Sequence, residues 1–426
     1  MRSIGQSRRS FLGLLLLSVL SLVMLAAPVW AQSPPLIDRE LFFGDPEIAG
    51  AQISPDGAFI AFIKPFKGTR NVWVKKTAEP FSSAKPITAD TKRPIPTYFW
   101  SRDGKYILFV QDQAGNENFN VYAVNPADPP ASGQDVPSAR NLTDAKGVRA
   151  FIYSVPRSEP DTIYVGLNDR DPAWHDLYKV KISTGERTLV RKNTERITGW
   201  IFDLKDQLRL ATRSAENGDT EVLRVDANGF QKIYSCNVFE TCGPVRYYKD
   251  GERTYFQTNK GNVDLVRLEL FNPTTGKEEL VESDPMNRVD FGDATFSEVS
   301  DELISTSYDD ERVRIYWKDK NFEADYKLLK EIVDGVVREQ PIIDPTVNRT
   351  LDAKWPLTRL DVTLRSILRA GAYELMFMEN VPARATINEY VDVAHAFFEE
   401  EEPRFVNGVL DRLARRRRPA EFEAGA

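Results

Sequence analysis

The sequence of 426 residues predicts a multidomain β + α protein, in which a β-propeller of six blade-sized units precedes an all-α helical bundle. Two observations predict this fold. Up to about residue 328, short alternating apolar runs recur with turn signals, which is typical of strands. Beyond that point the apolar positions follow the three- and four-residue spacing of helices. We therefore expect an export signal at 1–31, a propeller at 32–328, a helical domain at 329–418 and a tail at 419–426.

The first segment has the pattern of a bacterial export signal. Arg8 and Arg9 precede an apolar run at 11–27, and the small residues before Gln32 fit cleavage after Ala31. The paired arginines indicate the twin-arginine class. The run also approaches the ~20 residues that span a bilayer, so an uncleaved anchor is the alternative. In both cases the sequence predicts an exported, periplasmic location for the rest of the chain.

Each predicted blade begins with a turn followed by a β-branched or aromatic run. The clearest copies are residues 54–63 and 101–110. The turn aspartates recur at intervals of 44 to 58 residues, at Asp56, Asp103, Asp161, Asp206, Asp250 and Asp301. This period is typical of propeller blades, whereas a continuous sandwich does not predict it. Six units form either a closed six-bladed ring or an incomplete one with exposed strand edges.

The composition limits the chemistry of the sites. A net charge of -7 and a pI near 5.3 give no overall attraction to nucleic acid, so RNA binding would need a local patch. Two histidines and two cysteines are too few for a zinc site built from these residues, and no cofactor or metal is predicted. Cys236 and Cys242 are predicted to form a disulfide in an oxidising compartment, with two free thiols as the alternative.

Four segments before residue 330 carry a family resemblance, at 36–46, 51–57, 100–104 and 111–122. Together they resemble the propeller of bacterial serine peptidases of the prolyl oligopeptidase family, over about residues 35–330. The resemblance implies a propeller, usually of seven or eight blades, that caps an α/β-hydrolase domain and filters peptides by size. It also implies that the chemistry of the family lies in the hydrolase domain.

No catalytic residue is predicted. The sequence contains no Gly-x-Ser-x-Gly motif, and the triad mechanism also needs a histidine next to its serine. His175 precedes a predicted strand and His395 lies in a predicted helix, so both are interpreted as surface or packing residues. We therefore expect no peptidase activity from this chain.

Helix signals dominate after the seam at 322–340. Asp344 before Pro345 predicts an N-cap and a helix to about residue 353, and Asp361 predicts the start of the next. Pro382 and Pro403 mark two further helix starts. Gly371 within an apolar stripe predicts close approach of a neighbouring helix. These signals indicate a compact unit of about five helices.

Five segments of this unit, at 355–361, 365–375, 381–384, 387–391 and 405–411, resemble the NusB transcription antitermination factors in order and spacing. The resemblance covers about residues 326–418, the C-terminal two-thirds of that fold. It implies binding of a short RNA element together with the ribosomal protein NusE, and no DNA sequence readout. Carried over by motif, the RNA or partner contacts are Glu401, Arg404, Phe405 and Asn407, with core packing as the alternative for Phe405.

The sequence departs from that family at its start, because strands replace an arginine-rich first helix. From residue 356 to 426 there are ten arginines and no lysine against twelve acidic residues, so phosphate neutralisation is weak. The arginines at 415–418 either contact phosphate or complement the helix C-terminus and form a solvated tail. The acidic residues at 399–402 are predicted to form an exposed loop.

Two hypotheses result. In the first, the protein is a non-catalytic fusion that binds RNA and regulates transcription through its helical part. In the second, it is the remnant of an exported peptidase whose propeller acts as a peptide-gating or interaction scaffold. The export signal and the antitermination resemblance predict different compartments, which is best explained by a joining of two genes near codons 325–332.

Overall fold

The computed structural model describes residues 38–39, 44 and 48–423, except 80, 146, 262, 353–354 and 399–400. The chain divides into two compact units, 1–47 and 48–426, and nearly all described residues lie in the second. The predicted export signal at 1–31 lies outside the described residues. No helix within the described ranges is both long and apolar enough to cross a membrane.

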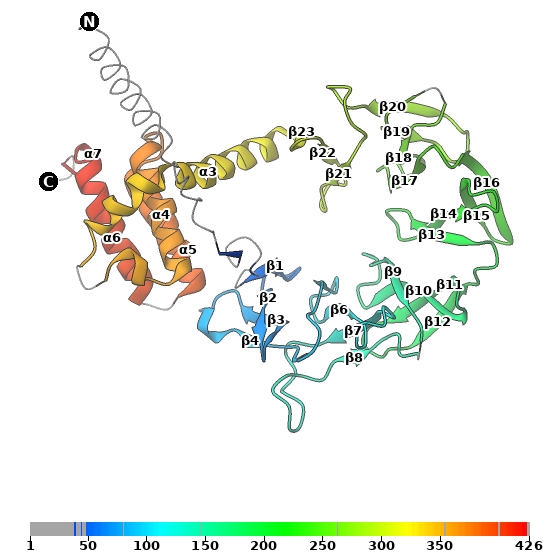
Figure 1. The fold of residues 1–426 in the computed structure, drawn as a ribbon, viewed down its shortest axis with the longest axis horizontal. Coiled ribbons are helices and arrows are strands. Elements are labelled where there is room, and N and C mark those ends of the chain that lie inside the picture. The colour runs from blue at the N-terminus through cyan, green and yellow to red at the C-terminus, as the bar shows by residue number, and fades with distance from the viewer. Residues whose placement is uncertain are drawn as a thin grey trace, which may run out of the picture. The chain divides into compact units, whose positions relative to one another are not determined.

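Six antiparallel sheets follow one another along the chain and around a ring (Figure 1), as the repeat predicted. Each sheet is one blade, and its strands pair in sequence order. The first three blades are β1 (Ala49–Ile53), β2 (Phe59–Phe66), β3 (Thr69–Lys76) and β4 (Lys85–Pro86); β5 (Tyr98–Trp100), β6 (Ile107–Gln111), β7 (Asn120–Val124) and β8 (Arg140–Asn141); and β9 (Ala150–Ser154), β10 (Thr162–Asp171), β11 (Trp174–Lys181) and β12 (Arg187–Arg191). A short 3-10 helix, η1 (Phe81–Ser83), precedes β4.

The next two blades also have four strands, whereas the sixth has three. They are β13 (Ile197–Phe202), β14 (Leu208–Ser214), β15 (Thr220–Asp226) and β16 (Gly229–Cys236); β17 (Cys242–Tyr247), β18 (Thr254–Thr258), β19 (Arg267–Phe271) and β20 (Glu278–Glu282); and β21 (Asp293–Phe296), β22 (Leu303–Asp309) and β23 (Val313–Trp317). The sixth blade has no fourth strand because the chain turns into a helix directly after β23.

Local turn chemistry explains the repeat. In the first blade, Asp56 accepts hydrogen bonds from the Ser54 hydroxyl at 2.5 Å and from the Ala58 amide at 3.0 Å. Gly57 follows with a φ of +71°, a left-handed conformation that costs glycine little. Asp103 makes the same two kinds of contact in the second blade. An aspartate side chain thus closes these hairpins within its own turn, so the signal is visible in the sequence.

Hydrophobic clusters join consecutive blades. Five clusters link the first blade to the second and so on to the sixth, through pairs such as Ile63 and Ile107, Val121 and Ile163, Leu177 and Trp200, Tyr234 and Phe256, and Tyr255 and Tyr308. Among the described residues, no such cluster joins the sixth blade to the first, and no sheet combines strands from both. The described residues therefore show five apolar junctions between consecutive blades.

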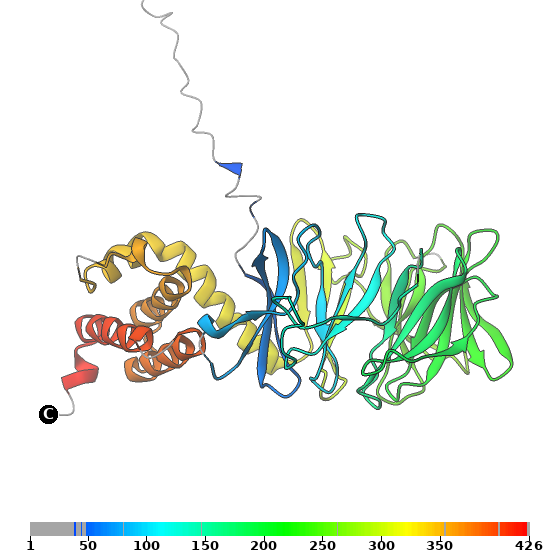
Figure 2. The ribbon, with the colours of Figure 1, turned by 90° about the horizontal axis from the view of Figure 1, so that it is seen from below.

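The helical part begins directly after β23. It comprises α3 (Lys320–Asn348), the 3-10 helix η2 (Leu357–Arg359), α4 (Val362–Phe377), α5 (Ala383–Phe397), α6 (Glu401–Arg417) and α7 (Ala420–Glu423), which form a bundle (Figure 2). Asp319 caps α3 by accepting hydrogen bonds from the amides of Asn321 and Phe322, at 2.9 and 3.3 Å. Helical structure thus starts several residues before the boundary predicted at 328/329.

The helix predicted to start at Asp344 does not exist as a separate element. Helix α3 continues through Pro341 and Pro345 to Asn348. Each proline costs about 3 kcal/mol in a helix interior, and burial of Ile343 and Val347 in the helical core offsets that cost. The Asp344 carboxylate does not cap the helix but accepts hydrogen bonds from Arg369, at 2.8 and 2.7 Å. Tertiary packing has overridden the local signal for a helix start.

Two of the other predicted helix starts are confirmed, whereas α6 begins at Glu401, two residues before Pro403, so residues 401–402 lie in a helix and not in the predicted exposed loop. Asp361 caps α4 by accepting hydrogen bonds from Thr363 and Leu364, and Pro382 stands at the N-cap of α5. A Cβ atom on Gly371 would lie 2.8 Å from Leu410 in α6, which confirms the predicted close approach of two helices. Along α3, Ile332 and Val336 pack against the core, whereas Leu329, Val333 and Val337 are exposed.

Gly335 in α3 is expected to tolerate no larger side chain. A Cβ atom there would lie 2.1 Å from the ring of Tyr373, which is buried and cannot move away freely. Overpacking of this kind costs about 1–3 kcal/mol, more than the helix propensity that alanine adds. We expect Gly335→Ala to lower the free energy of unfolding of the helical part, measured by denaturation followed by far-ultraviolet circular dichroism.

Gly408 in α6 provides the matched control. A Cβ atom there would have as its nearest neighbour the end of the Arg412 side chain, at 3.9 Å. Gly408→Ala should therefore keep or raise stability, by up to about 1 kcal/mol. Equal effects of the two substitutions would contradict the packing argument.

Candidate functional site

The predicted RNA or partner contacts lie together at the start of α6. Glu401, Arg404 and Asn407 are exposed on its first two turns. Phe405 is half-buried and packs against the core of the helical bundle. The structure thus brings the four residues to one helix end, and three of them are accessible to a partner.

The arginines at 415–418 do not form one group. Arg415 donates to Asp411 at 2.8 Å, one turn earlier, and Arg416 donates to the carbonyl oxygen of Arg349 at 3.2 Å. Arg417 is exposed. Arg418 is only 9% exposed, so the interpretation of the whole run as a solvated tail is wrong at this residue.

Arg418 completes the end of another helix. Its guanidinium donates to the carbonyl oxygens of Glu374, Leu375 and Met378 at 2.8–2.9 Å, where α4 ends. A fourth bond reaches the carbonyl oxygen of Val381 at 2.5 Å. The last carbonyl groups of a helix have no partner within the helix, and a cation there also complements the helix dipole. Arg418 therefore stabilises the fold and is not available to phosphate.

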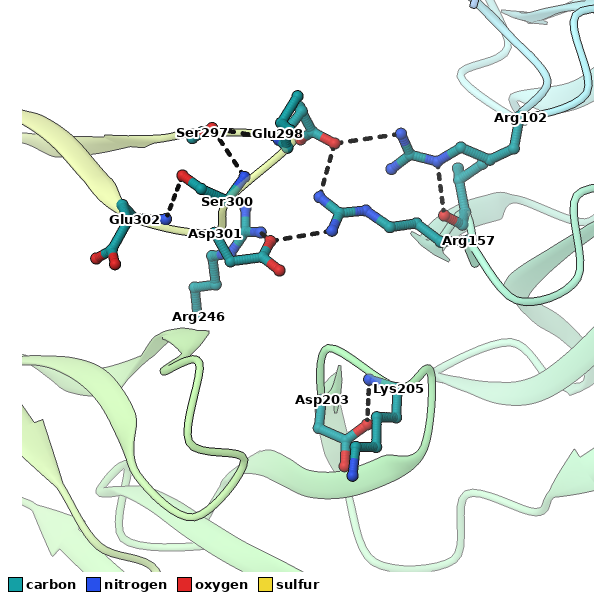
Figure 3. Close-up of polar contacts among 12 residues, drawn as sticks. Arg102, Arg157, Asp203, Lys205, Arg246, Ser297, Glu298, Ser300, Asp301 and Glu302 are labelled. Carbon is teal, nitrogen blue, oxygen red and sulfur yellow. Dashed lines mark hydrogen bonds and ion pairs between the residues drawn. The ribbon is translucent and has the colours of Figure 1, made fainter.

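A second candidate site lies on the propeller, where charged side chains from four blades meet (Figure 3). The loop between β21 and β22 presents Glu298 and Asp301. Arg102 comes from the turn between β5 and β6, Arg157 from the loop after β9, and Arg246 from β17. We call this group of three arginines and two carboxylates the arginine cluster.

The two carboxylates share the arginines. Glu298 accepts from Arg157 at 2.9 Å and from Arg102 at 3.3 Å. Asp301 accepts from Arg157 at 3.0 Å and from Arg246. These bonds connect the sixth blade to the second, third and fifth blades. The arginine cluster therefore ties the sixth blade to two blades, the second and the third, with which it shares no hydrophobic cluster among the described residues.

Local structure holds the loop rigid. The Asp301 amide donates to the Ser297 carbonyl at 3.0 Å, and the Ser297 hydroxyl accepts from the amides of Val299 and Ser300. Asp301 has a φ of +59°, a region that aspartate and asparagine enter more readily than most residues. The repeat therefore places an aspartate here for its turn, and the tertiary structure gives its carboxylate the arginine partners.

A cavity of about 540 Å³ is bordered by the arginine cluster. Aromatic side chains line much of the remainder, namely Tyr153, Trp200, Phe202 and Phe296. The acidic lining residue Asp203 is bound to Arg209 at 2.8 Å, and Asp206 accepts from the Ser158 amide at 2.7 Å. The cavity thus combines apolar walls with convergent charged groups, and its volume falls in the range of small-ligand sites.

The electrostatics of the cluster keep Glu298 ionised. Burial alone would raise the pKa of its carboxyl group, but the hydrogen bond from Arg157 and the charges of Arg102 and Arg157 outweigh burial. The pKa therefore lies below the ordinary 4.5. The ion pairs are complete above that value and are lost only as the pH falls toward the lowered pKa.

The sequence did not reveal the arginine cluster. Asp301 was recognised only as a turn residue, and Arg102, Arg157 and Arg246 stand 55 to 196 residues before the carboxylates that they bind. No spacing rule connects residues so far apart. A sequence feature connected with the cluster is that Arg102 directly precedes Asp103 in one of the repeated turns.

The remaining candidate residues lie apart from both sites. The structure joins Cys236 and Cys242 by a disulfide with a Cα–Cα distance of 6.1 Å. His175 packs against the ring of Phe151 at 4.7 Å between centroids, and burial lowers its pKa. His395 lies in the last turn of α5. Within the described ranges, no three His, Cys, Asp or Glu side chains are grouped as metal ligands.

Comparison with known proteins assigns the helical part. Residues 288–415 match the NusB family. The transcription antitermination protein NusB of Mesorhizobium japonicum is 55% identical over 94 residues, which are 22% of this chain and 61% of that protein. The C-terminal helical part is a NusB domain. The match begins in the segment between β20 and β21 and covers the sixth blade, whereas the helices of the NusB domain begin at Lys320.

The propeller region matches a different family. Dipeptidyl aminopeptidase BIII of Pseudoxanthomonas mexicana is 36% identical over 344 residues, which are 77% of this chain and 47% of that protein. A solved structure resembles the helical part. T. maritima NusB is 35% identical to this chain, and the matched region covers 25% of this chain and 72% of the T. maritima chain, with a TM-score of 0.22. The chain spans about half of the aminopeptidase and about three-fifths of the NusB relative.

Proposed function

We propose that this protein is a non-catalytic RNA- and partner-binding protein that acts through its NusB domain. The observation that carries the proposal is the NusB match together with the exposed side chains of Arg404 and Asn407 at the start of α6. Arg417 adds an exposed cation at the other end of the same helix. By family analogy the partners are a short RNA and the ribosomal protein NusE.

Electrostatics limit the strength of this binding. RNA affinity grows with the number of phosphates that cations neutralise, and several arginines of the NusB domain are committed to protein groups. Arg418 is buried, and Arg369 and Arg415 are paired with Asp344 and Asp411. We therefore expect weak RNA binding in isolation and stronger binding when the protein partner is present.

The test is a salt titration of RNA binding. Fluorescence anisotropy would follow a labelled pool of short single-stranded RNAs with and without purified NusE. Affinity should fall steeply with salt, with a log–log slope of about -0.7 for each neutralised phosphate. Arg404→Ala should reduce that slope by about 0.7, whereas Arg224→Ala, on β15 of the propeller, removes the same charge and should leave it unchanged. Absence of binding at low salt, with and without NusE, would refute the proposal.

A second candidate function is favoured by the cavity beside the arginine cluster. Its volume of about 540 Å³ and its mixture of aromatic and charged lining suit a short peptide segment. The propeller would then act as a peptide-binding scaffold without hydrolysis, since this sequence contains no Gly-x-Ser-x-Gly motif. Isothermal titration calorimetry with short peptides tests it, and heats no larger than those of dilution would count against it.

The two functions require different compartments, so their joint presence needs its own test. An export signal would separate the NusB domain from cytoplasmic RNA. Genomic DNA amplified across codons 300–360 of the source organism should give one uninterrupted product if the chain is a natural fusion. Separate products would mean that each half acts in its own protein.

A further inference from the structure

We propose that the cavity beside the arginine cluster recognises the carboxylate of a short peptide, and that Glu298 holds the position which the ligand carboxylate takes. This inference rests on the second candidate function, peptide binding by the propeller. It goes further by naming the chemical group that is recognised and the side chain that competes with it.

The first step is that Glu298 can be displaced. Its side chain is 64% exposed, and it is held by two arginine contacts at 2.9 and 3.3 Å. Ion pairs with an exposed carboxylate contribute little net free energy because solvent screens them. Asp301 differs, since its side chain is only 20% exposed and the turn fixes its backbone. A competing carboxylate would therefore exchange with Glu298 before it exchanged with Asp301.

The second step is that the arginines keep their positions when Glu298 leaves. The Nε atom of Arg102 donates to the Val155 carbonyl oxygen at 3.2 Å, which holds the side chain independently of any carboxylate. Arg157 remains bound through Nη1 to Asp301 at 3.0 Å. Two guanidinium groups held in this way are pre-organised for a carboxylate, which they bind through several parallel hydrogen bonds.

The third step concerns the rest of the ligand. Tyr153, Phe202 and Phe296 supply apolar walls for a side chain next to the carboxylate. Three further acids line the cavity, and each already accepts a hydrogen bond: Asp203 from Arg209, Asp206 from the Ser158 amide and Asp293 from the Ala294 amide. A carboxylate flanked by an apolar side chain, such as the C-terminal end of a short peptide, satisfies both features.

The experiment compares N-acetyl-alanyl-phenylalanine as the free acid and as the C-terminal amide, by isothermal titration calorimetry on the full chain. We expect the acid to bind at least about tenfold more tightly, because two charge-assisted contacts depend on its carboxylate. Glu298→Ala should raise the affinity for the acid by about two- to fivefold, in keeping with a weak exposed ion pair. Arg102→Gln should lower it by about tenfold.

Glu279→Ala is the matched control, since this exposed glutamate on β20 pairs with Arg253 outside the cavity. It should leave both affinities unchanged. Equal binding of acid and amide would overturn the carboxylate inference while leaving peptide binding intact. Failure of both ligands to bind would overturn the peptide-binding function as well. A fall in acid affinity on Glu298→Ala, with unchanged thermal unfolding, would show that Glu298 supports the ligand and does not compete with it.

Discussion

Replacing Arg418 by alanine is expected to lower the free energy of unfolding of the NusB domain by about 3 kcal/mol or more. Its guanidinium donates to four carbonyl oxygens around the end of α4, among them those of Leu375 and Met378. Hydrogen bonds from a charged donor are worth about 1.5–3 kcal/mol each, and buried acceptors left without partners add a further cost. Chemical denaturation followed by far-ultraviolet circular dichroism measures the loss.

Arg417 is the control for this substitution. It is the preceding residue of the same arginine run, but its side chain is exposed. Arg417→Ala should change stability by no more than about 0.5 kcal/mol. Arg418→Lys should recover little, because an ammonium group cannot reproduce the planar array of donors. If Arg417→Ala and Arg418→Ala destabilised the domain equally, net charge and not hydrogen bonding would be the cause.

The second large effect is expected at Asp284, which lies between the fifth and sixth blades. Its carboxylate is buried and binds Arg314 through two hydrogen bonds, at 2.7 and 2.8 Å. It also accepts from the amides of Met286, Arg288 and Val289. Asp284→Ala leaves these donors without their acceptor and should cost about 3–5 kcal/mol. Thermal unfolding monitored by near-ultraviolet circular dichroism of the propeller would report it.

The same group predicts a pH dependence. Hydrogen bonds from Arg314 outweigh burial and lower the pKa of Asp284 well below its ordinary 3.8. Because the pKa is lower in the folded state than in the unfolded state, the ionised carboxylate stabilises the folded protein fully above about pH 3.8. This stabilisation is lost as the pH falls from there toward the pKa of the folded state. Asp284→Asn should therefore flatten the acid limb of the stability profile. Asp226 forms an exposed pair with Arg224, so Asp226→Asn should leave the acid limb of the stability profile unchanged. A similar flattening in that variant would contradict the argument.

Prediction from sequence was most successful where the signal is local. The blades were found because turn aspartates recur along the chain, and Asp56 and Asp103 accept hydrogen bonds within their own turns. The starts of α4 and α5 were found because a capping residue acts on the first turn that follows it. The NusB domain was found for a related reason, since its motifs keep their order along the chain.

Prediction was wrong where distant residues decide. Pro345 after Asp344 is a valid start signal in isolation, but the pairing of Asp344 with Arg369 and the burial of Val347 keep α3 continuous. The arginines at 415–418 were expected either to contact phosphate or to complement a helix C-terminus and form a solvated tail, but Arg418 is buried and complements the C-terminus of a different helix, α4. In each case the local preference is worth a few kcal/mol and tertiary contacts exceed it.

The two-part architecture and the number of blades could be predicted from the sequence, because turns, caps and apolar periods act over a few residues. The NusB identity of the helices was indicated by the resemblance of five sequence segments to that family. The meeting of Arg102, Arg157 and Arg246 with Glu298 and Asp301 is visible only in the folded chain. The same holds for the absence, among the described residues, of an apolar cluster between the sixth and the first blade. Charges 55 to 196 residues apart become neighbours only after the blades have formed and packed, so no local pattern encodes their meeting.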